Sequence, residues 1–292
     1  VIERYSADAL RYWSAGATLG HDLRYLEEDV KGGKRLLTKL WNSTRFTMMN
    51  IGDWTPSSDV EEQPTPADLW IRSRVVAAVE GATAAFDQYE YNKAVRAAGN
   101  LFWRDWCDNY LEIVKDRFRN PGDWTTGQVE AARRTIYEGT WAMLRLFAPI
   151  LPFITEELYH CAIRPRMGAD APVSIHVAPW PQDDGGVTAF GGVRDAEAEQ
   201  TGDLLVDLVA AVRQLKTLAQ TGLGTPVKVV YVDCDAPTRA VVESLAADWK
   251  AAARASEIAF GSPTDAEHAA AEPTHEVAAR DIRIGIITIP RG

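Results

Sequence analysis

The sequence predicts a mainly α-helical protein, in which an antiparallel helix bundle is followed by a small α+β unit. Long stretches of helical periodicity fill residues 1–164, and the links between them are short. Residues 165–194 interrupt this pattern with clustered prolines and glycines. Beyond them, amphipathic stretches alternate with β-branched stretches. A chain of 292 residues is long enough for two such units, each with its own core.

The first helices are predicted from capping residues and glycines. Ser6 is a suitable N-cap with Asp8 in the first turn, so a helix should run to about Thr18. A long helix should follow from Glu27 to about Asn50, although two glycines at 32–33 weaken its first part. Residues 53–66 then form a polar connection.

The remaining helices of the bundle are separated by proline and glycine. We expect them at 67–89, 91–119, 125–147 and 152–163. Pro152 suits the first turn of the last of these, and the acids at 156–157 favour its positive end.

Residues 165–194 are predicted to be a linker that embeds a short extended piece at 173–177. In the unit that follows, residues 261–275 are small and polar and are expected to be mobile. Its helices are expected at 196–219 and 238–253, and its strands at 227–232, 257–260 and 282–289.

The formal net charge of −10 argues against a protein whose whole surface binds nucleic acid. The charge is unevenly distributed, however: residues 1–50 carry +2 and residues 181–292 carry −7. Five lysines and arginines and no acid lie between Lys31 and Arg45. An RNA site, if present, should therefore be local and close to this helix.

The helix through Lys39 has two chemically different sides. At about 100° per residue, Arg35, Lys39, Asn42 and Phe46 share one face, with Arg45 beside them. Lysine and arginine can hold phosphates, and asparagine can pair with a base edge. An ordinary solvated face explains the same spacing. The opposite side, which we expect to be buried, holds Leu36, Leu37, Leu40, Trp41, Thr44 and Met48.

A second aromatic and basic stretch covers residues 101–119. Aromatic side chains can stack on unpaired bases, but Phe102, Trp106 and Tyr110 recur every four residues, which favours a place in the core. The cations of this stretch are better candidates for surface contacts: Arg104, Lys115, Arg117 and Arg119.

Motifs for an independent active site are not found in the sequence. It holds no glycine-rich phosphate loop and no Ser/His/Asp arrangement. Cys107, Cys161 and Cys234 are far apart and odd in number, which favours neither a disulfide framework nor a metal site. This cysteine usage fits the reducing cytosol, so we expect a cytoplasmic protein. The sequence also has no apolar run long enough to cross a membrane and no signal-peptide pattern at its start.

Seven short segments, among them Lys39–Asn42 and Trp103–Glu112, occur in an order that resembles one family, the valyl-tRNA synthetases of class I. In the first of them Ser6 replaces the glycine of the usual Tyr-Gly-Ala-Asp pattern. The resemblance is good over residues 1–181 and looser over 195–289. The segments that carry it are Val1–Trp13, Leu19–Asp22, Lys39–Asn42, Trp103–Glu112, Ala148–Leu158, Ser174–His176 and Ala178–Pro181.

The resemblance implies a class I anticodon-binding bundle over residues 27–164. Residues 1–26 would be a connector that follows the catalytic domain and contacts the tRNA stem, 165–194 a linker, and 195–292 a small C-terminal α+β domain. The implied partners are valine tRNA and the catalytic and editing domains of the same parent chain, without membrane or DNA. From the helix face and the basic stretch described above, we expect the tRNA-binding residues to be Lys34, Arg35, Lys39, Asn42, Arg45, Phe46, Arg104 and Lys115.

The parent enzyme would be a valine--tRNA ligase that uses ATP and Mg, whereas this chain would hold no cofactor and be inactive alone. The family's catalytic motifs would precede Val1, and its C-terminal coiled coil is missing, either naturally or through a cut. Two alternatives stay open. The chain could be the same region of an isoleucyl- or leucyl-tRNA synthetase, or a helical protein-interaction module that binds no RNA.

Overall fold

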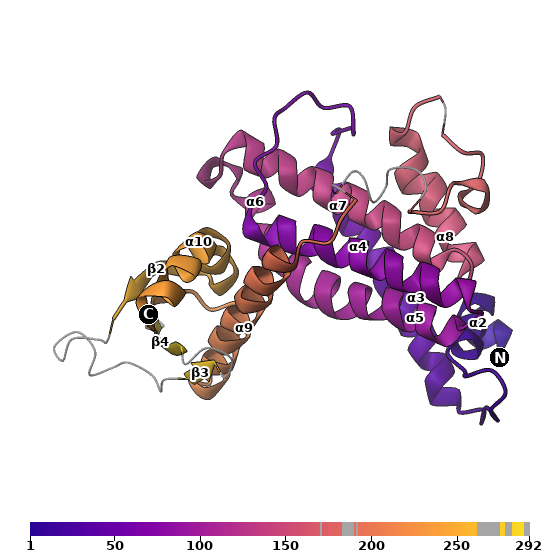
Figure 1. The fold of residues 1–292 in the computed structure, drawn as a ribbon, viewed down its shortest axis with the longest axis horizontal. Coiled ribbons are helices and arrows are strands. Elements are labelled where there is room, and N and C mark those ends of the chain that lie inside the picture. The colour runs from indigo at the N-terminus through magenta and orange to yellow at the C-terminus, as the bar shows by residue number, and fades with distance from the viewer. Residues whose placement is uncertain (170, 183–189, 191, 262–274, 278–281, 289–292) are drawn as a thin grey trace.

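The helices up to Ile163 pack side by side as a bundle, and a small sheet with two helices lies at one end of it (Figure 1). The computed structural model describes residues 1–169, 171–182, 190, 192–261, 275–277 and 282–288. Within these residues the predicted fold class, an antiparallel helix bundle followed by a small α+β unit, is confirmed.

The N-terminal helices are α1 (Ile2–Tyr5), α2 (Ala7–Ala15) and α3 (Glu27–Ile51). Ser6 caps α2 as expected, because its hydroxyl accepts a hydrogen bond from the Ala9 amide at 3.3 Å. Three acidic residues in the first turn of α3 favour the positive end of its dipole. Helix α2 packs against α3, so the start of the chain braces the longest helix of the bundle.

The middle of the bundle begins with α4 (Pro66–Asp87), which opens with a capping box between Thr65 and Asp68. One continuous helical rod then comprises α5 (Tyr91–Asn100), the π-helix η1 (Leu101–Tyr110) and α6 (Leu111–Arg119). The sequence predicts the rod but not its π-helical centre. As predicted, Phe102, Trp106 and Tyr110 are fully buried there.

A short 3₁₀ turn, η2 (Pro121–Asp123), leads to α7 (Thr126–Phe147). Helix α8 (Pro152–Leu158) passes into a π-helical turn, η3 (Tyr159–Ile163), and a 3₁₀ turn, η4 (Arg164–Arg166). The extended piece predicted at 173–177 is wrong. Residues Ile175–Val177 form the 3₁₀ turn η5, because the Ser174 hydroxyl accepts a hydrogen bond from the His176 amide and closes the chain.

The second unit contains α9 (Ala196–Leu218) and α10 (Ala236–Ala253) with a four-stranded sheet of order β2-β1-β4-β3. Strand β1 pairs in parallel with β2 (Val230 opposite Ile258) and antiparallel with β4 (Val230 opposite Ile286). The predicted mobile segment at 261–275 falls largely on residues 262–274, which lie outside the described residues. The strands are β1 (Val227–Asp233), β2 (Ala255–Phe260), β3 (His275–Val277) and β4 (Ile282–Thr288).

Helix α9 joins the two units by packing on both α4 and α10. The fully buried Trp70 of α4 fits against Gly202 of α9, where an added Cβ would lie 2.1 Å from the indole. The same indole donates a hydrogen bond to Asp203 at 3.0 Å. This contact fixes the position of α9, and with it the second unit, against α4 of the bundle.

No helix among the described residues has both the length and the apolar character needed to span a membrane.

Candidate nucleic-acid interface

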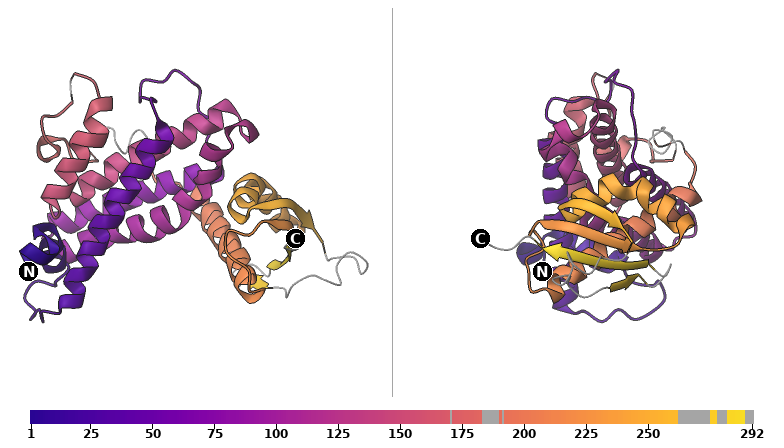
Figure 2. Two further views of the ribbon diagram at one scale, coloured as in Figure 1. Left: turned by 180° about the vertical axis from the view of Figure 1, so that it is seen from behind. Right: turned by 90° about the vertical axis from the view of Figure 1, so that its left-hand side faces the viewer.

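The outer face of α3 is the strongest candidate for contact with a nucleic acid. In the left panel of Figure 2, α3 crosses the near side of the bundle. Lys34, Asn42 and Arg45 are exposed there, as predicted. Lys34 and Arg45 form no ion pair with any described residue, so their charges are available to a partner. The name "α3 face" is used below for Lys34, Arg35, Thr38, Trp41, Asn42, Arg45 and Met49, all of which are exposed.

Trp41 belongs to the α3 face, and its predicted burial is wrong. Its side chain is 43% exposed. By helical geometry Trp41 lies within about 40° of both Lys34 and Arg45, at the border between the polar and apolar sides. The leucines at 36, 37 and 40 already fill the space beneath the helix, since all three are buried. The i−4 spacing from Arg45 was the signal in the sequence that could have placed this indole outside.

Lys39 and Phe46 lie on the flank of α3 that turns towards η1 and α6. Lys39 is 5.6 Å from the ring centre of Trp103 and 3.8 Å from the carboxylate of Asp108. Phe46 is half-buried, and the Lys115 ammonium lies 5.9 Å from its ring centre. The structure therefore brings Phe46 and Lys115 together, with Lys39 on the same flank, and each of the three already has a neighbour of opposite charge or aromatic character.

The two remaining predicted contacts, Arg35 and Arg104, are more peripheral. Arg35 forms an exposed ion pair with Glu28 at 3.0 Å. Arg104 is exposed on η1 and lies 3.5 Å from the carboxylate of Asp105. Lys115 also pairs with Glu112, one turn earlier on the same rod. Such exposed pairs contribute little to stability and can open to admit a phosphate.

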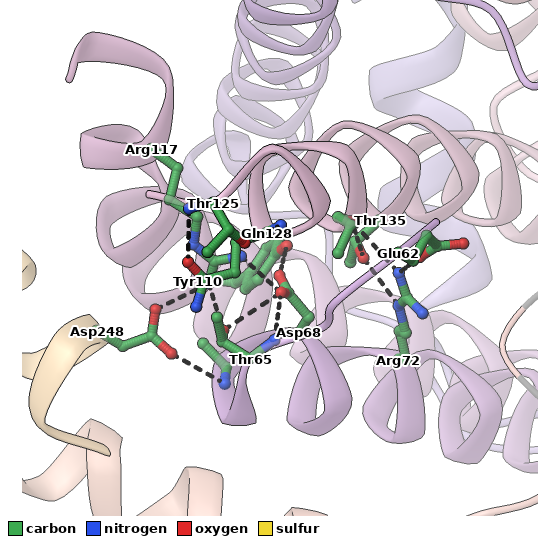
Figure 3. Close-up of polar contacts among 12 residues, drawn as sticks. Glu62, Thr65, Asp68, Arg72, Tyr110, Arg117, Thr125, Gln128, Thr135 and Asp248 are labelled. Carbon is green, nitrogen blue, oxygen red and sulfur yellow. Dashed lines mark hydrogen bonds and ion pairs between the residues drawn. The ribbon is translucent and has the colours of Figure 1, made fainter. Parts of the chain in front are cut away.

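Arg117 is not a surface residue, contrary to the prediction from its position among other cations. It is wholly buried between α4 and α10 (Figure 3). Its guanidinium donates hydrogen bonds to Asp68 at 2.5 Å, to Thr65 at 2.5 Å and to Asp248 at 2.8 Å. A buried arginine needs such partners, because an unpaired charge is very unfavourable away from water.

The group formed by Thr65, Asp68, Tyr110, Arg117 and Asp248 is called the arginine lock below. The Tyr110 hydroxyl donates to Asp68 at 2.6 Å, and the Asp248 carboxylate accepts from the Ala67 amide at 3.3 Å. Burial and the neighbouring Asp68 charge raise the pKa of Tyr110 well above its usual value. Burial acts to lower the pKa of Arg117, but the charges of Asp68 and Asp248 raise it above its usual value, so Arg117 stays ionised. The lock ties α10 to the bundle.

Possible metal ligands and reactive thiols were sought among the described residues of the whole chain. The described residues contain no group of three or more histidine, cysteine, aspartate or glutamate side chains that could hold a metal ion. All three cysteines are free thiols, and burial raises the pKa of Cys107 to about 12, which disfavours a reactive thiolate.

Comparison with known proteins places the chain in a family. A family model described as the anticodon-binding domain of tRNA ligase matches residues 68–231, which is more than half of the chain. This match begins in α4 and ends in β1, so it lies after α3 in the sequence.

Valine--tRNA ligases are among the relatives that the chain resembles. It is 35% identical to the enzyme of Anaplasma marginale, over 91% of this chain and 30% of that protein. It is 36% identical to the enzyme of Haloarcula marismortui, over 74% of this chain and 22% of that protein. A solved LeuRS from Agrobacterium radiobacter K84 is similar at a TM-score of 0.43 and 17% identity, over 68% of this chain and 21% of that one. The chain thus spans less than a third of the length of these relatives.

Proposed function

This chain belongs to the anticodon-binding domain family of the tRNA ligases, and we propose that it binds the anticodon arm of valine tRNA along the α3 face and its flank. The choice of valine tRNA is supported by the valine--tRNA ligases among its relatives. The observation that carries the choice of surface is an exposed tryptophan between two cations that form no ion pair with a described residue. Aromatic rings stack on unpaired bases, and cations hold the phosphates between them.

In the whole ligase, the proposed role is recognition and positioning. The parent reaction would be ATP-dependent and Mg-dependent charging of valine tRNA in the cytoplasm, carried out by a catalytic domain with an editing domain beside it. Binding energy at the anticodon helps to orient the distant 3′ end, so loss of this contact would reduce turnover as well as affinity.

We also propose the four-part organisation predicted from the sequence: a stem-contact connector at 1–26, an anticodon-binding bundle at 27–164, a linker at 165–194 and a C-terminal α+β domain at 195–292. The packing of α2 on α3 supports a connector that is fixed to the bundle. The packing of α9 on α4 means that the last part is docked on the bundle as well.

The test is binding of a valine tRNA transcript to this chain and to its Lys39→Ala/Arg45→Ala variant over a series of salt concentrations. We expect the double variant to bind at least about tenfold more weakly, with a log–log salt slope shallower by about 1.4–1.8, because two phosphate contacts are lost. Lys228→Ala is the matched control, since Lys228 is exposed on β1, away from α3.

Thermal melts of the same proteins separate lost contacts from lost folding. Arg45 is exposed, and the contacts of Lys39 with Asp108 and Trp103 lie at the surface, so the double variant and the Lys228→Ala control should both melt like the parent. Unchanged affinity in the double variant would refute the surface. If the affinity of the unmodified chain for tRNA does not change with salt concentration, the alternative of a helical protein-interaction module is favoured. Tighter binding of isoleucine or leucine tRNA would reassign the specificity.

A further inference from the structure

A groove of about 1340 Å³ runs between the bundle and the second unit. One wall comes from η1 and α6, and the other comes from α9, α10 and the start of β2. Lys39 and Lys115 line the bundle side of this groove. It therefore opens on the flank of α3, beside the surface proposed above to bind RNA.

The wall from the second unit has an unusual charge. Residues 181–292 contain ten lysines and arginines and seventeen acids. Among the described residues of this stretch that line the groove, four are cations and none is an acid. The cations are Arg213, Lys216, Lys250 and Arg254. A strongly acidic part of the chain thus presents a basic surface at this one place.

Three of these four cations can reach a ligand. Lys250 and Arg254 are exposed, and Arg213 is half-buried. None of the three forms an ion pair with a described residue. Arg254 also donates one hydrogen bond to the Gly224 carbonyl oxygen at 3.0 Å. Lys216 is different because it is buried, and its ammonium donates to the carbonyl oxygens of Leu223 and Ala253 at 3.1 and 2.8 Å. Burial lowers the pKa of Lys216 to about 8, so its role is to brace the wall.

The acids in the groove all come from the bundle, and most already have partners. Asp108 faces Lys39 at 3.8 Å, and Glu112 pairs with Lys115. Asp116 accepts hydrogen bonds from the Trp124 indole at 3.1 Å and from the Asn120 amide at 2.8 Å. Asp123 also lines the groove and forms no ion pair with a described residue. In total, seven cations and four acids line the groove, and no ion pair among the described residues joins an acid of the bundle to Arg213, Lys250 or Arg254.

The two walls are held at a fixed separation. Arg213 donates to the backbone oxygen of Asp108 at 3.3 Å, which ties α9 to η1. The arginine lock ties α6 to α10, because Arg117 bonds Asp248 at 2.8 Å. A groove whose walls are joined at both sides is already formed before a ligand arrives, which lowers the entropic cost of binding.

We propose that this groove holds the sugar-phosphate backbone of the RNA whose bases contact the α3 face, with Arg213, Lys250 and Arg254 as its phosphate contacts. The inference rests on the proposed function and assigns an RNA-binding role to the C-terminal α+β unit. Lysine and arginine contacts to phosphates hold the RNA backbone and fix its position on the protein, whereas contacts to the bases read the sequence.

The test is binding of a valine tRNA transcript to the full chain and to Lys250→Ala, Lys250→Glu and Arg213→Ala/Lys250→Ala variants. Lys228→Ala is again the control, because Lys228 is an exposed lysine of the same unit outside the groove. We expect Lys250→Ala to weaken binding about threefold to tenfold and to reduce the salt slope by about 0.7–0.9. Lys250→Glu should weaken binding further, and Lys228→Ala should bind like the parent.

Lys250 is exposed and unpaired among the described residues, so its replacement leaves folding intact and the result is interpretable even if Arg213→Ala loosens α9. Parent-like affinity and salt slope in both Lys250 variants, together with weak binding by Lys39→Ala/Arg45→Ala, would overturn the groove and keep the proposed function. A parent chain that does not bind the transcript would overturn both.

Discussion

At the scale of single residues, the candidate site is defined by which charges are already satisfied. Lys34 and Arg45 have no ion pair within the described residues, whereas Arg35 bonds Glu28 and Lys115 bonds Glu112. Trp41 stands between the two free cations and is exposed. In the proposed function, an unpaired base of the RNA would stack on this indole.

The exposure of Trp41 gives a stability prediction that can be compared with a buried tryptophan. Trp41→Ala should cost about 1 kcal/mol or less, because much of the indole already faces water. Trp106→Ala should cost about 3–5 kcal/mol, since Trp106 is fully buried and bonds Ser43 at 3.1 Å. Urea unfolding of both variants measures the difference. Equal losses would mean that Trp41 is packed in solution.

At the scale of helices, the positions of two glycines explain how α3 is held. Gly33 lies where α2 crosses α3, and a Cβ added there would be 2.7 Å from the Ala9 carbonyl oxygen. Gly32 faces open space, where the nearest atom is an Arg35 nitrogen at 3.7 Å. The two adjacent glycines therefore differ in role. Only Gly33 is required for the close packing of α2 on α3.

The two glycines should respond oppositely to the same substitution. Gly33→Ala is expected to destabilise the protein by about 1–3 kcal/mol, because the backbone of α2 must move. Gly32→Ala should be neutral or stabilise by up to about 1 kcal/mol, because alanine favours the helix. Thermal melts of the pair provide the comparison. A stabilising Gly33→Ala would show that α2 does not cross α3 this closely.

At the scale of the whole molecule, the arginine lock decides how the bundle and the C-terminal unit are arranged. Arg117 on α6 is held between Asp68 on α4 and Asp248 on α10 (Figure 3). All three charged groups are buried, so each depends on the others for solvation. The lock therefore joins three helices that are distant in sequence and keeps the basic groove beside α3.

Removal of one partner of the lock should destabilise the whole chain. We expect Asp248→Ala to cost about 3–5 kcal/mol, because Arg117 keeps its charge but loses one of its two carboxylates. Asp233→Ala is the control and should change stability by less than about 0.5 kcal/mol, since its ion pair with Arg283 is exposed. Chemical denaturation measures both, and similar midpoints for the two variants would contradict the lock.

The sequence by itself determined the helices, the fold class and most of the outward charges of α3. These follow from local periodicity and capping, which depend on neighbours a few residues away: Ser6 caps α2, and Leu36 and Leu40 are buried as predicted. The π-helical form of η1 was not predictable in this way, because residues four apart share a side in either kind of helix.

Only the tertiary structure decided which side chains from distant segments meet. Arg117 and Asp248 are 131 residues apart. Helical spacing places Arg117 on the buried side of its helix with Ile113 and Val114, but no local pattern identifies its distant partners. The exposure of Trp41 was also decided by packing. Trp41 lies at the border between the polar and apolar sides of α3, and the buried leucines of this helix occupy the space beneath it. The groove also depends on the docking of α9 and α10, because burial of Trp70 and Arg117 between separate elements sets the position of its second wall.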